Sequence, residues 1–385
     1  MMTLATVIPA RSSTHFGYLP ALDGLRALAI GAVLAEHAGI PRVSGYHGVT
    51  LFFVISGFLI TSLLLRERAG TGTIDFRRFY LRRFARLGPA LVVVVLVTWG
   101  WLALTGQPMS SYWAGIVGAL TYTTDLMQTV TGNAGVGQYY QWSWSLGVEE
   151  LFYLVWPAAL LLLVRWRSFG AAVALLVAGI AGVWVLRFLL TTNGVSHDHY
   201  FFGPDTNADA LLLGALLAFV LVRFPDHWIP RITGRVIGPV GLVALIALVV
   251  LRGSNLLPQV DSGAFGQSAL ASAALVLWMA TSSNGWTARI FSWRPAVFVG
   301  KLSYGLYLWN LLTIFAFTSI VGWNPTHSPW GILWAAVLFS LAYASWRFVE
   351  TPLRRRWAPA PVAEAEHMSV PASVALRERE LTVVG

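Results

Sequence analysis

The sequence contains no cysteine, and only 11% of its 385 residues are charged. The first absence excludes disulfides, thiolate metal ligands and thiol nucleophiles. The second sets the chain apart from soluble domains, in which about a quarter of the residues are charged. Lysine is almost absent as well, since Lys301 is the single lysine among 26 basic residues. With 56% hydrophobic residues and a mean hydropathy of +0.65, the composition indicates an integral membrane protein.

Eleven apolar segments are candidates for membrane spans: 20–39, 47–65, 88–105, 111–130, 145–164, 169–190, 207–223, 234–252, 265–281, 298–321 and 330–350. The weakest is 111–130, because its second half, TYTTDLMQTV, is too polar to face lipid. If this segment does not cross and the N-terminus is cytoplasmic, nineteen basic residues of the connecting segments lie inside and three outside. If it crosses, the later basic clusters move outside.

The sequence therefore predicts an all-α polytopic integral membrane protein with about ten transmembrane helices. Both termini are expected in the cytoplasm, with an outer or re-entrant segment near 111–130. Residues 18–357 form one membrane domain, flanked by polar tails at 1–17 and 358–385 that are expected to be disordered.

The first apolar segment carries four ionisable residues, although each costs a few kcal/mol at the bilayer centre. At 100° per residue Asp23, Arg26 and His37 share a stripe about 60° wide, whereas Glu36 points elsewhere. Asp23 and Arg26 are also spaced to form an ion pair, which is a structural alternative for Asp23. His37 has no such neighbour, and histidine is the most common general base.

The stretch QWSWSLGVEELFYLVWP, residues 141–157, places Glu149 and Glu150 near the start of a predicted helix. Carboxylates are stabilised there by the helix dipole, which is a purely structural reading for one of them. In the ten-span topology the pair lies at the same depth as His37. A histidine and a carboxylate at that level form a plausible base and its orienting group.

The stretch IDFRRFYLRRFARLGP, residues 74–89, interleaves arginines with aromatic residues. The pattern fits an amphipathic helix on anionic lipid. It fits equally a cytoplasmic site for a phosphorylated ligand, because arginine binds phosphate bidentately. Nucleic acid is not expected as a partner. The candidate ligand-binding arginines are Arg78, Arg82, Arg83 and Arg86.

Ser56 and Gly57 lie in the middle of the second span, where small residues typically allow close helix packing. A serine nucleophile would need an adjacent base, which this segment does not supply, although the backbone here could shape a cavity. His197, Asp198 and His199 have metal-ligand chemistry but no second cluster to complete a site, so no metal is predicted.

Taken together, these stretches resemble the acyltransferase 3 family of polytopic membrane O-acyltransferases, in order from about residue 18 to residue 357. The matching motifs are LDGLRALA, GVTLFFVISGFLIT, RRFARLGP, WSLGVEELFYLVWP, GKLSYGLYLWN and FVETP. Two positions depart from the family pattern: Asn207 stands where arginine is usual, and Asn310 where histidine is usual.

The resemblance implies transfer of an acyl group from acyl-CoA, acetyl-CoA or another short-chain thioester, to a hydroxyl of a sugar-containing acceptor. It implies His37 as general base, with Arg26, Glu149 and Glu150, the last as an essential carboxylate, in the catalytic centre. Arg78, Arg82, Arg83 and Arg86 would bind the CoA diphosphate, with Ser56, Gly57 and Tyr153 beside the donor.

The chain resembles stand-alone actinomycete members that acylate macrolide sugars or cell-envelope glycans and glycolipids. The competing hypothesis is a transporter or flippase of a lipid-linked or glycosylated substrate, which would use the same intramembrane charges as a substrate path.

Overall fold

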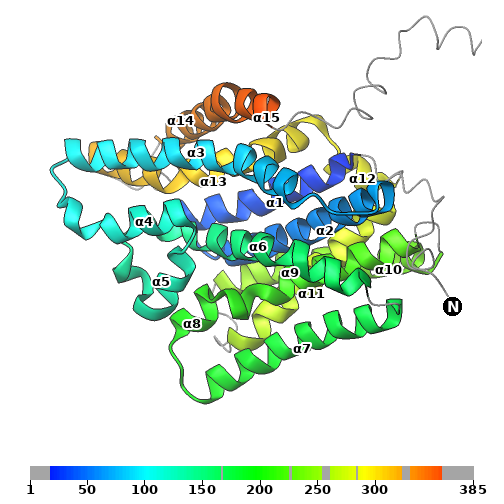
Figure 1. Cartoon of the computed structure of the whole chain (residues 1–385). Coiled ribbons are helices and arrows are strands. Elements are labelled where there is room, and N and C mark those ends of the chain that lie inside the picture. Colours follow the sequence, from blue (N-terminus) through cyan, green and yellow to red (C-terminus); the bar gives the residue numbers. More distant parts are fainter. Residues whose placement is uncertain are drawn as a thin grey trace, which may run out of the picture.

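The computed structural model describes residues 18–165, 168–224, 228–253, 261–282, 285–322 and 330–357, so both predicted tails lie outside the described residues. Within these ranges every regular element is helical. The long helices are α1 (Pro20–His37), α2 (Tyr46–Thr71), α3 (Phe76–Leu104), α6 (Trp144–Arg165), α7 (Phe169–Thr192), α9 (Pro204–Arg223), α10 (Trp228–Gly253), α11 (Asp261–Thr281), α13 (Arg294–Val321) and α14 (Gly331–Ala344). Figure 1 shows them as one bundle of helices running back and forth between two ends.

Nine helical stretches of the described chain are long and apolar enough to cross a membrane, and they coincide with nine of the ten predicted spans. The tenth is α1, which has 18 residues but carries Asp23, Arg26 and Glu36. It packs against α2 and α13, so neighbouring helices rather than lipid surround much of its surface. The prediction of an all-helical polytopic membrane protein is confirmed.

The segment 111–130 forms two short helices, α4 (Trp113–Thr121) and α5 (Thr124–Thr131). They are separated at Tyr122, whose backbone is left-handed with φ of 56°. Nine and eight residues are far fewer than the about 20 that a transmembrane helix needs. Together with the 3-10 turns η3 (Gly132–Gly135) and η4 (Gln141–Ser143) and the helix α8 (His197–Phe202), they form one end of the bundle (Figure 1).

Glycines allow the central helices to approach one another closely. A Cβ on Gly57 of α2 would lie 2.0 Å from the carbonyl oxygen of Leu211 in α9, and one on Gly214 would lie 2.1 Å from that of Val54. Small residues at such crossings let membrane helices pack backbone to backbone. The packing reading of Gly57 therefore agrees with its place in the fold.

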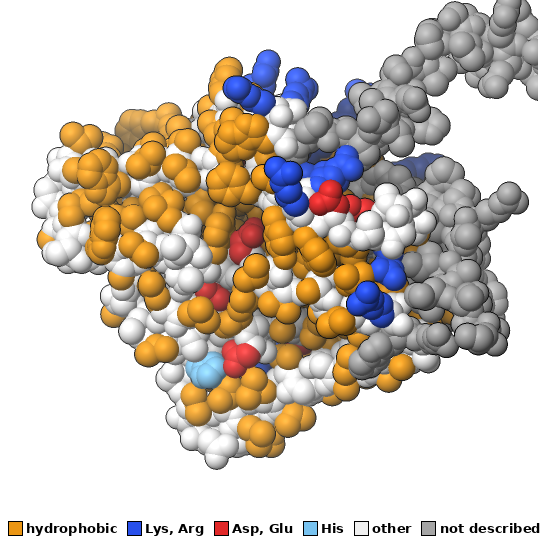
Figure 2. Space-filling model, viewed as in Figure 1, with side chains coloured by type: hydrophobic (Ala, Val, Ile, Leu, Met, Phe, Trp, Pro, Cys, Tyr) orange, Lys and Arg blue, Asp and Glu red, His pale blue; other side chains and the backbone are white. Residues whose placement is uncertain are grey.

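Basic side chains gather at the end of the bundle where α2 ends and α3 and α13 begin. Figure 2 shows them over α15 (Thr351–Trp357) and the adjoining ends of α2 and α3, while the flank of the bundle is largely hydrophobic. We call this the basic end. It is the end that the positive-inside rule predicts to be cytoplasmic.

Candidate functional site

A cavity of about 1150 Å³ lies among α1, α2, α3, α6 and α13 and the C-terminal helical segment. This is larger than the pockets of about 300–1,000 Å³ that hold drug-sized ligands. Four acidic and eight basic side chains line it, so its charge favours an anion. The basic lining residues are Arg26, Arg66, Arg78, Arg82, Arg83, Arg86, Lys301 and Arg354.

The start of α3 turns its arginines toward the cavity. The carboxylate of Asp75 accepts a hydrogen bond of 2.9 Å from the backbone N–H of Arg78 and so caps the helix. At 100° per residue the four predicted arginines, 78, 82, 83 and 86, then cover one side of the helix, and all four line the cavity. The outward side carries the exposed Leu81 and Phe84 instead. Arg77 lies on this outward side as well, so four of the five arginines between residues 77 and 86 line the cavity and one does not.

Ser56, Glu149 and Tyr153 meet in the wall of the same cavity. The Ser56 hydroxyl donates a hydrogen bond of 2.6 Å to Oε1 of Glu149, and the Tyr153 hydroxyl donates one of 3.0 Å to Ser56 Oγ. The guanidinium of Arg83 lies 4.3 Å from the centre of the Tyr153 ring, within the range of a cation–π contact. Two helices, α2 and α6, thus bring a hydroxyl, a carboxylate and a phenol into one connected group, and α3 adds the guanidinium of Arg83.

Arg26 lines the cavity from α1, where its guanidinium lies 3.7 Å from the carboxylate of Asp23. Tyr18 donates a hydrogen bond of 2.6 Å to the same carboxylate. Burial and the neighbouring carboxylate raise the pKa of the Tyr18 phenol above its usual value, so it stays protonated and keeps donating. The ion pair that the i, i+3 spacing predicts is therefore present.

His37 lies outside the lining of the cavity and pairs with an amide. Its Nδ1 is 2.6 Å from Oδ1 of Asn310, whose Nδ2 donates to the backbone carbonyl of Tyr307. The bond to Tyr307 identifies Nδ2 as the donor of the Asn310 amide, so Oδ1 is its acceptor. Nδ1 of His37 must therefore donate to Oδ1 and carries the proton of the neutral ring. Nε2 then has the free lone pair. The partner that sequence reasoning expected for His37 was a carboxylate, and the group that contacts it is Asn310.

Two further predicted site residues lie outside the cavity lining. Glu150 follows Glu149 by one residue, a rotation of about 100° on α6, and is not a lining residue. Gly57 occupies the contact between α2 and α9 described above. The arrangement thus joins Arg26, Ser56, Glu149, Tyr153 and the four arginines of α3 in one space, and leaves His37, Glu150 and Gly57 around it.

Sequence reasoning missed Glu350 and Arg354, which also line the cavity. Glu350 ends a π-helical turn, η6 (Ser345–Glu350), and is 9% exposed. π-helical turns are frequent at functional sites. Arg86 and Arg354 line the same cavity as Glu350. The motif FVETP, residues 348–352, contains Glu350 and is the sequence signal that could have identified it.

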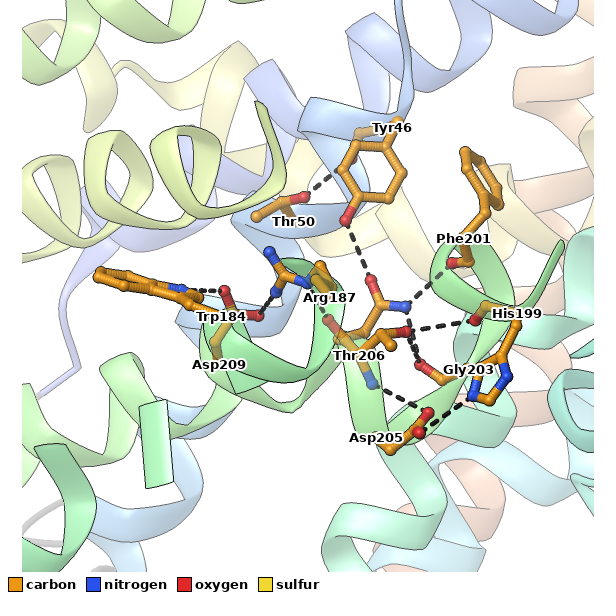
Figure 3. Close-up of polar contacts among 11 residues, drawn as sticks. Tyr46, Thr50, Trp184, Arg187, His199, Phe201, Gly203, Asp205, Thr206 and Asp209 are labelled. Carbon is orange, nitrogen blue, oxygen red and sulfur yellow. Dashed lines mark hydrogen bonds and ion pairs between the residues drawn. The ribbon is translucent and has the colours of Figure 1, made fainter. Parts of the chain in front are cut away.

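A second polar cluster, drawn in Figure 3, ties α7 and α9 to α2 away from the cavity. Arg187 forms a buried ion pair with Asp209, and its Nε donates to the carbonyl of Thr206 at 2.6 Å. Asn207 is buried beside them: its Oδ1 accepts from Tyr46 at 3.0 Å, and its Nδ2 donates to two backbone carbonyls. The asparagine thus has hydrogen-bond partners for both of its amide atoms, in keeping with a structural role.

Asp125 at the start of α5 is a buried carboxylate outside the spanning helices, at 1% exposure. Burial raises its pKa to about 6, against the opposing effect of nearby backbone amides. Gly147 of α6 makes room for it, since a Cβ there would lie 2.3 Å from Oδ1 of Asp125. No group of three histidine, aspartate or glutamate side chains placed to hold a metal ion occurs within the described residues.

A helical bundle with a large cavity lined mainly by basic side chains defines a polytopic membrane protein. The family model described as an acyltransferase domain matches residues 19–346. The chain belongs to this acyltransferase family, as its motifs predict.

Three relatives of the chain are named as O-acetyltransferases or candidate O-acetyltransferases. The chain is 31% identical over 370 residues to the peptidoglycan O-acetyltransferase OatA of Listeria monocytogenes, a match that covers 88% of this chain and 56% of the relative. It is 32% identical over 378 residues to a candidate O-acetyltransferase of Staphylococcus aureus, covering 92% and 61%. A candidate peptidoglycan O-acetyltransferase of Bacillus subtilis, YrhL, is 29% identical over 375 residues, covering 88% and 55%. The chain thus spans somewhat more than half the length of these relatives. No solved structure gives a significant match.

Proposed function

We propose that this protein is an O-acyltransferase that takes its acyl group from acyl-CoA and transfers it to a hydroxyl of a sugar-containing acceptor. The observation that carries the proposal is the cavity, which combines eight basic side chains with a hydroxyl–carboxylate pair deeper in the bundle. CoA is a polyanion with a long neutral arm. Arginines bind its phosphates bidentately, and the arm can extend between helices toward the reacting groups.

In this proposal the basic end faces the cytoplasm, where acyl-CoA is present. Arg78 and Arg82 stand at the start of α3 and meet the phosphates first. Arg83 and Arg86 lie up to two turns further along the helix and neutralise the remaining charge. Arg26 adds a cation from α1 at a level where the thioester would pass.

His37 is the proposed general base toward the acceptor. Asn310 holds the proton of the neutral ring on Nδ1, which leaves Nε2 free to take the proton of the attacking hydroxyl. The pair connects to the cavity through Tyr307, whose carbonyl accepts from Asn310 and whose side chain lines the cavity. Glu149 is the carboxylate at the reacting end of the cavity.

The names of the relatives favour an acceptor of the cell envelope, with peptidoglycan as the first glycan to test. A glycolipid or a macrolide-type glycoside presents the same chemistry, a sugar hydroxyl near the membrane surface. The plasma membrane is the expected location.

The test uses the purified full chain and His37→Ala in detergent. Free thiol is measured with acetyl-, propionyl- and longer acyl-CoA thioesters, each with and without peptidoglycan fragments, glycolipids and macrolide glycosides. We expect acceptor-dependent thiol release that falls by about 100-fold or more in the variant, because general-base catalysis contributes factors of that size. Release that is unchanged in His37→Ala would remove that residue from its role.

A transporter or flippase would not release thiol in detergent, where there is no second compartment. Absence of release with every donor and acceptor, from protein with a cooperative thermal transition, would refute the acyltransferase proposal.

A further inference from the structure

Ser56 has the surroundings of a nucleophile, which its own helix does not supply. Its hydroxyl proton points at Oε1 of Glu149, 2.6 Å away, although the two residues are 93 positions apart in the chain. A hydroxyl within hydrogen-bond reach of a base, with a third group that orients the pair, is the usual arrangement of an activated nucleophile. Here the third group is Tyr153, which donates to Ser56 Oγ at 3.0 Å.

The group is positioned by contacts on two sides. Tyr153 lies against the guanidinium of Arg83, so an arginine of the ligand-binding helix supports the phenol. On the other side of Ser56, Gly57 holds α2 in backbone contact with Leu211 of α9. The dipeptide Ser-Gly thus has two functions in one helix, since the glycine sets the position of α2 and the serine faces the cavity.

Ser56 differs from the other serines of the cavity wall. Ser62, Ser145 and Ser303 line the same space, and Ser145 pairs with the hydroxyl of Tyr307 at 2.6 Å. Among these serines of the described chain, Ser56 is the one that donates to a carboxylate. It is also only 6% exposed.

We infer that Ser56 carries the acyl group as an ester between the donor and the acceptor. This rests on the proposed function, because the donor is the acyl-CoA named above. In the first step the Ser56 Oγ–carbonyl bond forms and the C–S bond of the thioester breaks. Glu149 takes the hydroxyl proton and passes it to the departing sulfur, so that CoA leaves as the thiol.

In the second step the acceptor hydroxyl attacks the Ser56 ester. The new C–O bond to the acceptor forms, the bond to Ser56 Oγ breaks, and the proton lost by the acceptor is balanced by the proton that restores the Ser56 hydroxyl. The sum of both steps is the overall transfer, with no oxidant, metal or further reactant. The membrane-embedded serine would let the CoA thiol depart toward the basic end before the acceptor arrives.

The experiment omits the acceptor. Purified full chain is mixed with the short-chain acyl-CoA that gives the fastest turnover, quenched in acid, and analysed by intact mass and peptide mapping. We expect one acyl group on Ser56, formed together with a burst of one thiol per protein. Ser56→Ala is expected to lose both, and to lower acceptor-dependent turnover by about 1,000-fold or more. Glu149→Gln is expected to slow the burst by about 100-fold or more.

The matched control is Ser62→Ala, on the same helix and in the same cavity wall, which is expected to keep the label. A second variant, Ser56→Cys, guards against an alanine variant that does not fold. Because the chain has no cysteine, a thioester in this variant can only be at position 56. We expect its label to be released by neutral hydroxylamine, whereas the ester of the unmodified protein needs alkaline hydroxylamine.

Acceptor-dependent turnover without any protein-bound acyl group, retained in Ser56→Ala, would overturn the inference and leave the proposed function standing. So would a label that maps to another residue. Absence of thiol release under every condition would refute the proposed function, and the ester with it.

Discussion

Replacing Arg82 by alanine tests whether the basic cavity binds the phosphates of CoA. Arg82 lines the cavity, whereas Arg77, five residues earlier on the same helix, is exposed and is not a lining residue. A hydrogen bond to a charged group contributes about 1.5–3 kcal/mol. At 1.4 kcal/mol per factor of ten, losing one such contact raises the KM for acyl-CoA by about 10- to 150-fold. Because Arg82 is partly exposed, we expect the lower part of this range.

The assay compares acyl-CoA with acyl-pantetheine, which has the same thioester arm without the phosphates. Arg82→Ala is expected to raise the KM for acyl-CoA with little change in kcat, and to leave the kinetics of acyl-pantetheine unchanged. Arg77→Ala is the matched control and should behave like the unmodified protein with both donors. An equal effect of Arg82→Ala on the two donors, or an equal effect of Arg77→Ala, would refute phosphate binding by this face of α3.

Asn310→Leu removes the acceptor that holds the proton on His37 Nδ1; we expect kcat to fall by about 10-fold or more, with the KM for acyl-CoA unchanged. Gly57→Ala should lower the free energy of unfolding by about 1–3 kcal/mol in thermal melts, whereas Gly31→Ala, whose Cβ would have nothing within 4 Å, should not. The raised pKa of Asp125 favours its neutral form in the folded state. Its contribution to the free energy of unfolding is therefore full below about pH 4 and is lost as the pH rises through about 6. Asp125→Asn should reduce the fall of Tm with rising pH, and a pH profile of Tm that is unchanged in this variant would contradict the prediction.

Much of the architecture followed from local properties of the sequence. Apolar runs of about 20 residues predict spans because the bilayer sets their length, and nine of the predicted spans coincide with long helices. The polar second half of 111–130 predicted a segment that does not cross, and this segment forms two helices of nine and eight residues, each shorter than a span needs. The arginines of α3 face one cavity because helical periodicity places residues 78, 82, 83 and 86 on one side.

The contacts of the candidate site were decided by packing between helices that are distant in the chain. From the residues of its own segment Ser56 is predicted to be a packing residue, because no base lies near it along the chain. In the folded protein the base is Glu149, which α6 brings to α2. Sequence reasoning expected a carboxylate beside His37, and α13 brings Asn310 from 273 positions away. It assigned no role to Glu350, which reaches the cavity through a π-helical turn.

The physical reason for this division lies in the range of the forces involved. Hydropathy, helical periodicity and capping act over a few residues and can be read from any stretch of the chain. Which helices touch, and at what rotation, depends on how side-chain volumes and glycine contacts such as those of Gly57 and Gly214 fit together across the whole bundle. The sequence by itself determined a helical membrane protein with arginines on one face of a helix, and the tertiary structure decided which hydroxyl, carboxylate and imidazole can act together.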